Sequence, residues 1–431
     1  MIINDLMPFK NKFIQNIQIY QCAPNFNIDP TNPDHILGIS RNYKDLLELS
    51  KKNAKNILQN KRTEKKAVYK LFDDFFQSGE YNNYNAVDLV KSYGKNYYRP
   101  WEQGMYDQFL ATYYSFAGNI DKADSVWCNL IRGKSDICFE ETDNIDFMSK
   151  ISDNQVVIFN EAHHVPKHRY LVGTLLDTLY EKGFRYLALE AFYNDSLFST
   201  LNFPTTGNGF YIRESTFANL IRKALEKGYR IIGYDNNEKE RERLQAESIY
   251  NQTLKDDKNA KIVVLAGYAH ISRDWMAGEF EKISGIRPLT INQTYAYSLS
   301  LGNKNMPQDS VFLIRDTTDN QQKFDADLLI YNNLIIKNNC FSSTNSLTTS
   351  ISVPDSLSEN CSIICLYNKH ELDCFNNNED KDWKPLPIGV YHPQNQKEIT
   401  INLCEGEYEV LFFNDYGQAL FTKGIKIAKP I

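Results

Sequence analysis

Short apolar runs separated by longer mixed stretches dominate the middle of the chain. Four of them follow one another, at Val156–Phe159, Tyr186–Leu189, Arg230–Tyr234 and Lys261–Gly267. The stretches between the runs are long enough for crossover helices, which is typical of parallel strands. We therefore expect an α/β fold with a mainly parallel sheet and flanking helices.

The periodicity of the chain changes on both sides of this region. Helical spacing marks Tyr43–Asn60 and Ala67–Gln77, and Ala111–Trp127 resembles half of a tetratricopeptide-type helical pair. After Ser342 the composition shifts to Ser, Thr and Asn with short alternating apolar runs. These changes predict a helical, TPR-like domain over 1–147, an α/β domain over 148–340 and a small antiparallel β-sandwich over 341–431.

Composition narrows the classes of protein that fit. The chain has 431 residues, 42% of them hydrophobic, and a formal net charge of -6 without a long basic run. This balance argues against nucleic-acid binding, and no stretch is apolar for long enough to span a membrane. We expect a soluble protein, cytoplasmic on the chain as given, or periplasmic or at the cell surface if an export signal was removed. A small-molecule substrate is expected, with a protein partner possible through the helical or β domain.

Cysteine spacing gives no metal motif. Five of the eight cysteines fall in the last hundred or so residues, without a Cys-x-x-Cys pair. Buried thiols are therefore favoured over a zinc site, and one or two disulfides in this region would fit an exported protein.

Ionisable residues follow each of the four apolar runs. In open α/β sheets, catalytic and binding groups gather at the carboxyl ends of the strands. The sequence therefore predicts one crevice lined by carboxylates and imidazoles, the groups used in proton transfer and metal binding. The candidates are Glu161, His163, His164, Glu190, Asp235 and His270.

Glu161 and His164 have the spacing of a carboxylate that orients a general base. In a tight turn after a strand both can face the crevice, and a carboxylate held against an imidazole raises its basicity and fixes its tautomer. His163 is interpreted as a cap of the following helix or a substrate contact. His168 and Arg169 are expected to face solvent, and so is most of the charged helix 238–250, apart from Arg241 and Gln245.

Several motifs in order resemble the erythromycin esterase family. They are Glu161-x-x-His164, Leu187–Glu190, Arg241–Glu247, Ala266–His270 and Phe324–Ala326, and the resemblance covers residues 148–339. The wider group that shares this fold includes ChaN-like haem-binding lipoproteins and TraB/TIKI-like metalloproteases. The resemblance implies that His164 is the base that activates water, with Glu161 as its orienting carboxylate. Glu190, Arg241 and His270 match further site residues of the family.

The chain departs from the family pattern at three places. Asn160 replaces the usual glycine and can adopt a positive φ there. Gln245 and Tyr268 stand where the family has other residues, so the pocket lining has changed. We therefore expect an ester or related acyl bond as the target, but not a macrolide.

Three functions remain open on the sequence. The first is a cofactor-free hydrolase, with Arg241 disfavouring a cation and with His163, Asp235, Tyr268 and Tyr193 contacting the substrate. The second is a protein that binds haem or another iron compound through a histidine or a tyrosine, with Tyr268 and Tyr193 as candidates, and a hydrolase that depends on a divalent metal is a further alternative. The metal set would be His164, Glu190 and His270. The third is an inactive scaffold that presents the outer modules to another protein.

Overall fold

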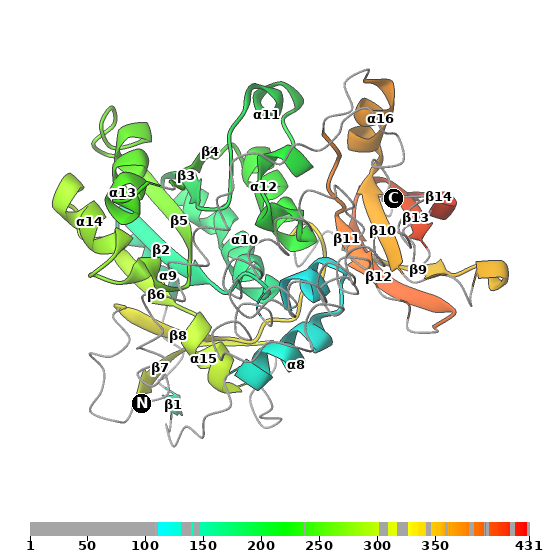
Figure 1. The fold of residues 1–431 in the computed structure, drawn as a ribbon, viewed down its shortest axis with the longest axis horizontal. Coiled ribbons are helices and arrows are strands. Elements are labelled where there is room, and N and C mark those ends of the chain that lie inside the picture. The colour runs from blue at the N-terminus through cyan, green and yellow to red at the C-terminus, as the bar shows by residue number, and fades with distance from the viewer. Residues whose placement is uncertain are drawn as a thin grey trace, which may run out of the picture. The chain divides into compact units, whose positions relative to one another are not determined.

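The computed structural model describes about three fifths of the chain, in two compact units (Figure 1). The first lies within 131–204 and 208–343, and the second within 9–130, 205–207 and 344–431. The predicted helices Tyr43–Asn60 and Ala67–Gln77 lie outside the described residues, so a separate helical domain over 1–147 stays a prediction. The described residues are 108, 111–130, 139–141, 147–236, 238–300, 309–316, 326–341, 346–357, 361, 363–378, 383–391, 393, 396–413 and 419–428.

The first unit is built on an eight-stranded sheet in the order β1-β7-β8-β6-β2-β5-β3-β4. The strands from β8 to β4 run parallel, and β7 and β1 add to the β8 edge as antiparallel strands. The prediction of a mainly parallel α/β sheet is therefore confirmed. The strands are β1 Phe139–Glu141, β2 Val156–Glu161, β3 Phe184–Leu189, β4 Arg230–Gly233, β5 Lys261–Gly267, β6 Leu289–Asn292, β7 Val311–Asp316 and β8 Leu328–Asn332.

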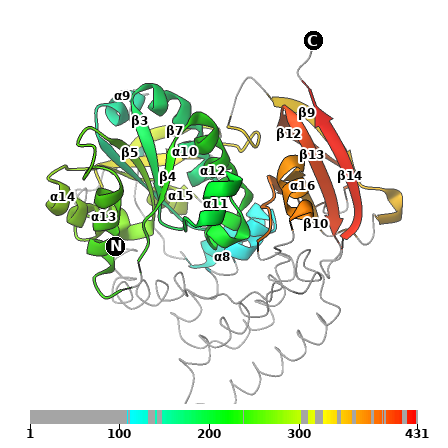
Figure 2. The ribbon, with the colours of Figure 1, turned by 90° about the horizontal axis from the view of Figure 1, so that it is seen from above.

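Helices cover both faces of this sheet, as the view along its edge shows (Figure 2). Helices α10 and α12 lie on one face and α13 and α14 on the other. The helical segments are α9 Phe147–Ser152, α10 Pro166–Glu181, α11 Ser196–Leu201, η3 Thr206–Asn208, η4 Tyr211–Arg213, α12 Ser215–Lys227, α13 Arg241–Gln252, η5 Tyr268–Ile271, α14 Met276–Ser284 and α15 Thr294–Ser300.

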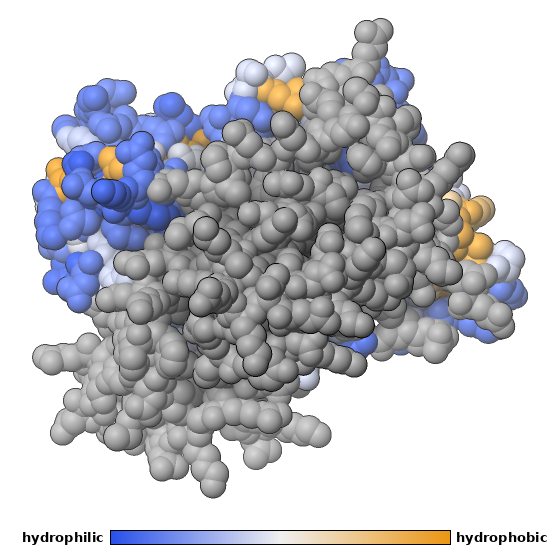
Figure 3. Space-filling model, in the orientation of Figure 1, coloured by the Kyte–Doolittle hydropathy of each residue, from blue (hydrophilic) through white to orange (hydrophobic). Residues whose placement is uncertain are grey.

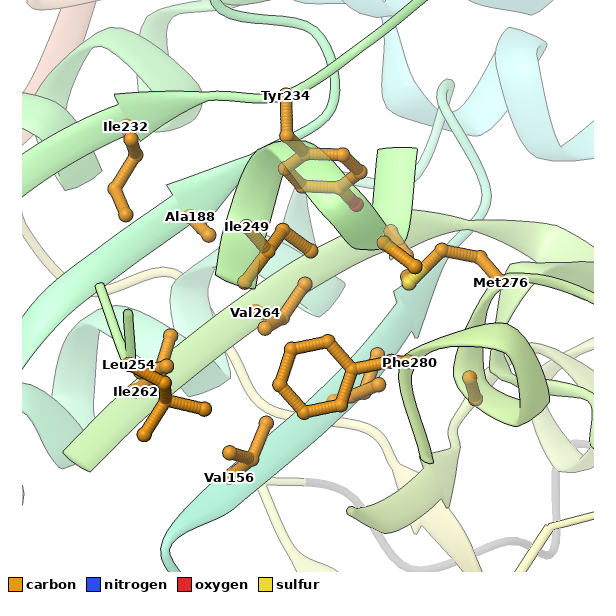
Figure 4. Close-up of a cluster of buried hydrophobic side chains, with 14 of the residues drawn as sticks. Val156, Ala188, Ile232, Tyr234, Ile249, Leu254, Ile262, Val264, Met276 and Phe280 are labelled. Carbon is orange, nitrogen blue, oxygen red and sulfur yellow. The ribbon is translucent and has the colours of Figure 1, made fainter. Parts of the chain in front are cut away.

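The core on the α13 and α14 side packs against the central strands (Figure 4). Val156 of β2 and Val264 of β5 meet Ile249 of α13 and Phe280 of α14, and none of the four is exposed to solvent. Both faces of a parallel sheet are covered in this way, which explains why its strands read as continuous apolar runs. The packed strands provide a rigid base for the loops at their carboxyl ends.

The second unit contains a helix-turn-helix segment. Residues 111–116 are helical, Gly118 has a φ of 73°, and the next helix is α8, Ile120–Leu130. A positive φ suits glycine, and the side chain of Asn119 accepts a hydrogen bond from the backbone of Lys122. The helix-turn-helix prediction is thus met over these residues.

Two antiparallel sheets form the rest of the second unit. One has the order β11-β10-β13-β14 and the other pairs β12 with β9. Ile364 and Phe412 of the first sheet share a hydrophobic core with Ile351 and Ile401 of the second, so the prediction of an antiparallel β region is confirmed. Helix α16 was not expected. The elements are β9 Ser346–Ser352, η7 Asp355–Leu357, β10 Ile363–Asn368, α16 Lys369–Asn377, β11 Gly389–Tyr391, β12 Glu398–Cys404, β13 Gly406–Phe413 and β14 Ala419–Ile427.

The cysteines of the C-terminal region differ in oxidation state. Cys340 and Cys404 are each disulfide-bonded, whereas Cys361, Cys365 and Cys374 are free thiols. Burial raises the pKa of Cys365 to about 12, so this thiol stays protonated and packs as a small apolar residue.

The described surface around α13 and α14 is polar (Figure 3), and no described helix is suited to crossing a membrane. The described surface around α13 and α14 that is visible in Figure 3 is mostly hydrophilic. Within the described part of the chain, no helix combines the length and the hydropathy needed to cross a membrane.

Candidate functional site

The carboxyl ends of β2, β5, β3 and β4, where the sequence predicts a crevice, lie side by side. Glu161 is the last residue of β2 and pairs in register with Gly267, the last residue of β5. Glu190 follows β3, and its backbone N–H donates to the carbonyl oxygen of Leu265 at 3.3 Å. Asp235 follows β4 in the same way. The strand-end argument therefore placed these residues on the correct edge of the sheet.

Glu190 is the centre of the first charged group, which also contains Arg241 and His270. One carboxylate oxygen, Oε1, lies 2.8 Å from Nη2 of Arg241 and 3.2 Å from Nε2 of His270. The other, Oε2, accepts a hydrogen bond from the backbone N–H of Gly267. Burial alone would raise the pKa of Glu190, but His270 and Arg241 outweigh it and hold the pKa well below its usual range.

Asp235 completes the support of Arg241. Its Oδ1 lies 2.6 Å from Nη2 of Arg241 and accepts a second hydrogen bond, at 2.7 Å, from the amide of Gln245. Nε of Arg241 donates to the backbone carbonyl of Asn236 at 3.0 Å. A planar guanidinium held at several corners keeps one orientation, so Asp235 acts on the site through Arg241. The expectation that Gln245 is not solvent-facing is met.

His270 lies between two carboxylates. Its Nδ1 is 2.7 Å from Oε2 of Glu242, and its Nε2 faces Glu190. Burial by itself would lower the pKa of His270, but Glu190 and Glu242 raise it to about 9. The ring is therefore an imidazolium at neutral pH, and both nitrogens donate. Nη1 of Arg241, 3.0 Å from Nε2, is then a neighbouring positive charge that these carboxylates offset.

This raised pKa predicts a loss of stability in alkaline solution. A group whose pKa rises on folding contributes all of its stability below the ordinary value of 6.5 and loses it as the pH climbs through about 9. For His270 the contribution is on the order of 3 kcal/mol. The midpoint of chemical unfolding, compared at pH 6 and pH 9.5, should fall more for the wild type than for His270→Gln. Equal falls in the two proteins would show that His270 is not charged in the fold.

Glu161 forms the second charged group, with His163 and Arg169. Its Oε1 lies 3.0 Å from Nδ1 of His163, and its two oxygens accept from Nε and Nη2 of Arg169 at 2.6 and 2.9 Å. Burial would raise the pKa of Glu161, but Arg169 and His163 lower it to about 2. An ionised carboxylate can only accept, so Nδ1 of His163 donates, and in the neutral ring Nε2 carries the lone pair.

The ring of His163 is enclosed by aromatic side chains and by the first charged group. It stacks on Tyr211 with a centroid distance of 3.9 Å and meets the edge of Tyr268 at 5.2 Å. A methyl group built on Gly267 would stand 3.2 Å from Nε2 of His163 and 3.0 Å from Oε2 of Glu190. These two atoms therefore both lie against Gly267, where the two charged groups meet.

The prediction that Glu161 orients His164 is wrong, because the carboxylate contacts the ring of His163 instead. His164 is fully buried, and its pKa lies well below the usual range because of burial and the positive charge that His168, His163 and Arg169 can carry nearby. His163 does not cap the next helix either, since α10 starts after Val165 without a side-chain cap. The structure thus assigns Glu161 to the ring adjacent to the predicted one, whereas the role of His164 as a base stays a prediction.

His168 and Arg169 were also misplaced by the sequence, which put them in solvent. Both are fully buried. Nδ1 of His168 accepts a hydrogen bond from the backbone N–H of Ala162 at 3.0 Å, and burial lowers its pKa to about 3. The neutral ring thus fixes the backbone between Glu161 and His163. This contact explains why the turn after β2 presents His163 to Glu161.

The other predicted residues have different outcomes. The side chain of Tyr193 is 44% exposed, and Tyr268 borders His163 with a φ of 31°. Among the residues that the structure describes, no three His, Cys, Asp or Glu side chains are grouped as metal ligands, so the alternative set of His164, Glu190 and His270 is not assembled there.

Asn160 has a structural role that differs from the predicted one. It lies in β2 and does not have a positive φ. Its amide donates to the backbone carbonyl of Tyr268 at 2.9 Å, and its Oδ1 accepts from the backbone of Gln293 at 2.8 Å. The side chain of Gln293 returns a hydrogen bond to the carbonyl of Asn160. This buried amide network holds the loop that carries Tyr268 beside the site.

Sequence reasoning missed four residues of the site: Arg169, Tyr211, Glu214 and Glu242. Glu242 had one usable signal, since it is adjacent to Arg241 in the first turn of α13. The others had none, because Tyr211 and Glu214 follow no strand and Arg169 lies within a helix.

Comparison with models of protein families, with curated proteins and with solved structures found no match.

Proposed function

We propose that the protein hydrolyses an ester or a related acyl bond, with water activated by a histidine that lies beside Gly267. The observation that supports this most is the arrangement of two imidazoles with different roles around one carboxylate. His163, held by Glu161, presents a basic nitrogen, and His270, held by Glu190 and Glu242, presents a proton. Acyl hydrolysis uses such a base and such an acid.

His163 is a better candidate for the base than His164. A base must attract a proton, and an imidazole whose pKa is held well below its usual range does so poorly. His164 is in that position because it is buried. The ring of His163 faces an ionised Glu161, which stabilises the positive charge that forms when Nε2 takes a proton. The proposal therefore moves the base from His164 to its neighbour.

His270 and Arg241 supply positive charge on the other side. With a pKa of about 9, His270 carries its proton at pH 7 and can give it to a leaving oxygen. Arg241 is fixed by Asp235 and Glu190, so its guanidinium is oriented before a substrate arrives. Preorganised charge of this kind stabilises an oxyanion without a reorganisation cost during the reaction.

The proposed reaction balances as follows. Nε2 of His163 takes one proton from water, and the water oxygen forms a bond to the acyl carbon. The bond from that carbon to the leaving oxygen breaks, and the leaving oxygen takes a proton from His270. One proton must then pass from His163 to His270, directly or through solvent, before the next turnover. No step of this proposed reaction uses a metal ion, so a chelator should leave the rate of hydrolysis unchanged.

A panel of chromogenic acyl esters tests the proposal. The full chain, assayed at pH 7 with and without a strong chelator, should hydrolyse at least one acyl ester well above the background rate. The matched control is the double variant His163→Gln with His270→Gln, which should show only background. Absence of hydrolysis across short, long and aromatic acyl groups would count against the proposed function, and loss of activity on chelation would favour a metal-dependent reaction instead.

A further inference from the structure

We infer that Arg169 is a positioning residue, which fixes the ring of His163 through Glu161 and so sets the base for the reaction. The inference rests on the proposed function for its kinetic consequence, but the arrangement itself can be measured without a substrate. Arg169 contacts Glu161, Glu214 and the backbone carbonyl of His163, and it carries out no proton transfer in the proposed reaction.

The guanidinium of Arg169 donates hydrogen bonds to both members of the Glu161 and His163 pair. Nε and Nη2 hold the two oxygens of Glu161 as a fork. Nη2 also donates to the backbone carbonyl of His163 at 3.0 Å. One planar group therefore fixes the carboxylate that contacts the ring and the backbone from which the ring extends. Lysine cannot reproduce this, since its ammonium is a point charge without a planar fork.

Arg169 is itself anchored on the side away from His163. Nη1 lies 3.1 Å from Oε2 of Glu214, and the guanidinium lies over the ring of Phe217 at 4.5 Å. Glu214 caps α12 by accepting from the backbone N–H groups of Thr216 and Phe217 at 2.8 and 3.0 Å. The position of Arg169 is thus tied to the start of a helix, which is a rigid reference point.

The same segment reaches His163 by a second route. Tyr211 stacks on the imidazole, and η4, which contains Tyr211, directly precedes Glu214. The ring is therefore held in its plane by Tyr211 and at Nδ1 by Glu161. Of these two restraints, only the one through Glu161 also sets which ring nitrogen carries the proton, because the carboxylate requires Nδ1 to donate. Arg169 controls that restraint.

The test compares Arg169→Lys with a control that breaks another ion pair between the same two helices. Asp177 of α10 lies 3.1 Å from both Lys223 and Lys227 of α12, and its side chain is partly exposed. Asp177→Asn removes those contacts without touching Glu161 or His163. Glu214→Gln is a second variant, which keeps Arg169 and weakens its outer anchor together with the cap of α12.

The first measurement is nuclear magnetic resonance of protein labelled with [15N]histidine. The His163 ring signals are assigned as those that disappear in His163→Gln. In the wild type and in Asp177→Asn, the ring should carry its proton on Nδ1. In Arg169→Lys a mixture of the two tautomers should appear, with a smaller change in Glu214→Gln. Unchanged ring signals in Arg169→Lys and Glu214→Gln would overturn the inference, whatever happens to hydrolysis.

The second measurement is kinetic. With an ester found in the panel, Arg169→Lys should lower kcat by about ten- to a hundredfold at an unchanged KM, since a slightly misplaced base costs rate but not binding. Asp177→Asn should keep the wild-type kcat. A rise in KM at constant kcat would overturn the positioning role. If no ester is hydrolysed, the proposed function fails, and the tautomer measurement still decides the position of the ring.

Discussion

His163→Gln is expected to lower kcat for an acyl ester at least about a hundredfold, the usual loss when a general base is removed. Glutamine keeps a donor for Glu161 and fills most of the space of the ring, so the fold should remain intact. It cannot take a proton from water, however. The measurement is steady-state kinetics on the best ester of the panel, with circular dichroism to show that both proteins are folded.

His164→Gln is the variant that separates the two possible assignments. The ring of His164 is fully buried and, with its pKa held well below the usual range by burial, uncharged at neutral pH, so its loss should lower thermal stability more than kcat. We expect less than a tenfold change in kcat for the fraction that folds. Full activity in His163→Gln together with loss in His164→Gln would restore the assignment that the family resemblance implies.

The strands of the sheet were predictable because their environment is uniform. β2, β3, β4 and β5 are covered on both faces by helices, so each reads as an apolar run. β6 was missed because it has only four residues, Leu-Thr-Ile-Asn, and does not form a continuous apolar run. The order of the strands could not be predicted. β5 enters between β2 and β3, a pairing that depends on contacts between residues far apart in the chain.

The strand-end rule was enough to collect Glu161, Glu190, Asp235 and His270. It uses only the end of each strand, and all four residues lie at or shortly after such an end. The rule cannot choose between adjacent residues, since the direction of each side chain depends on the backbone of the turn. In this turn the direction is set by the hydrogen bond from Ala162 to His168, a contact that becomes visible only when α10 is packed against β2.

The burial of charged side chains in helices was the other feature that the sequence could not predict. A charge on a helix is usually solvated, and that expectation holds for Arg243, whose side chain is 46% exposed. It fails for Arg169, because Glu161 and Glu214 offset the cost of burying its guanidinium from two sides. Glu214 lies 45 residues further along the chain, so no local pattern connects the two.

Gly267→Ala is expected to abolish hydrolysis without removing any charged group, because Gly267 lies directly against His163 and Glu190, the groups between which the reaction is proposed. The backbone there has a φ of -70°, which alanine adopts without strain. The only change is a methyl group, which would stand 2.9 Å from Cε1 of His163 and 3.0 Å from Oε2 of Glu190. Both contacts are closer than ordinary packing, so the imidazole must also shift.

We expect the loss in kcat to be about a hundredfold or more, as for other displacements of catalytic groups by about 1 Å. Gly424→Ala is the matched control, because a methyl group there meets only Oε1 of Glu409, at 3.6 Å, an ordinary contact. The two variants should differ strongly in rate. If Gly267→Ala folds and keeps the wild-type kcat, the reaction does not take place between His163 and Glu190, and the site must be sought elsewhere on the rim.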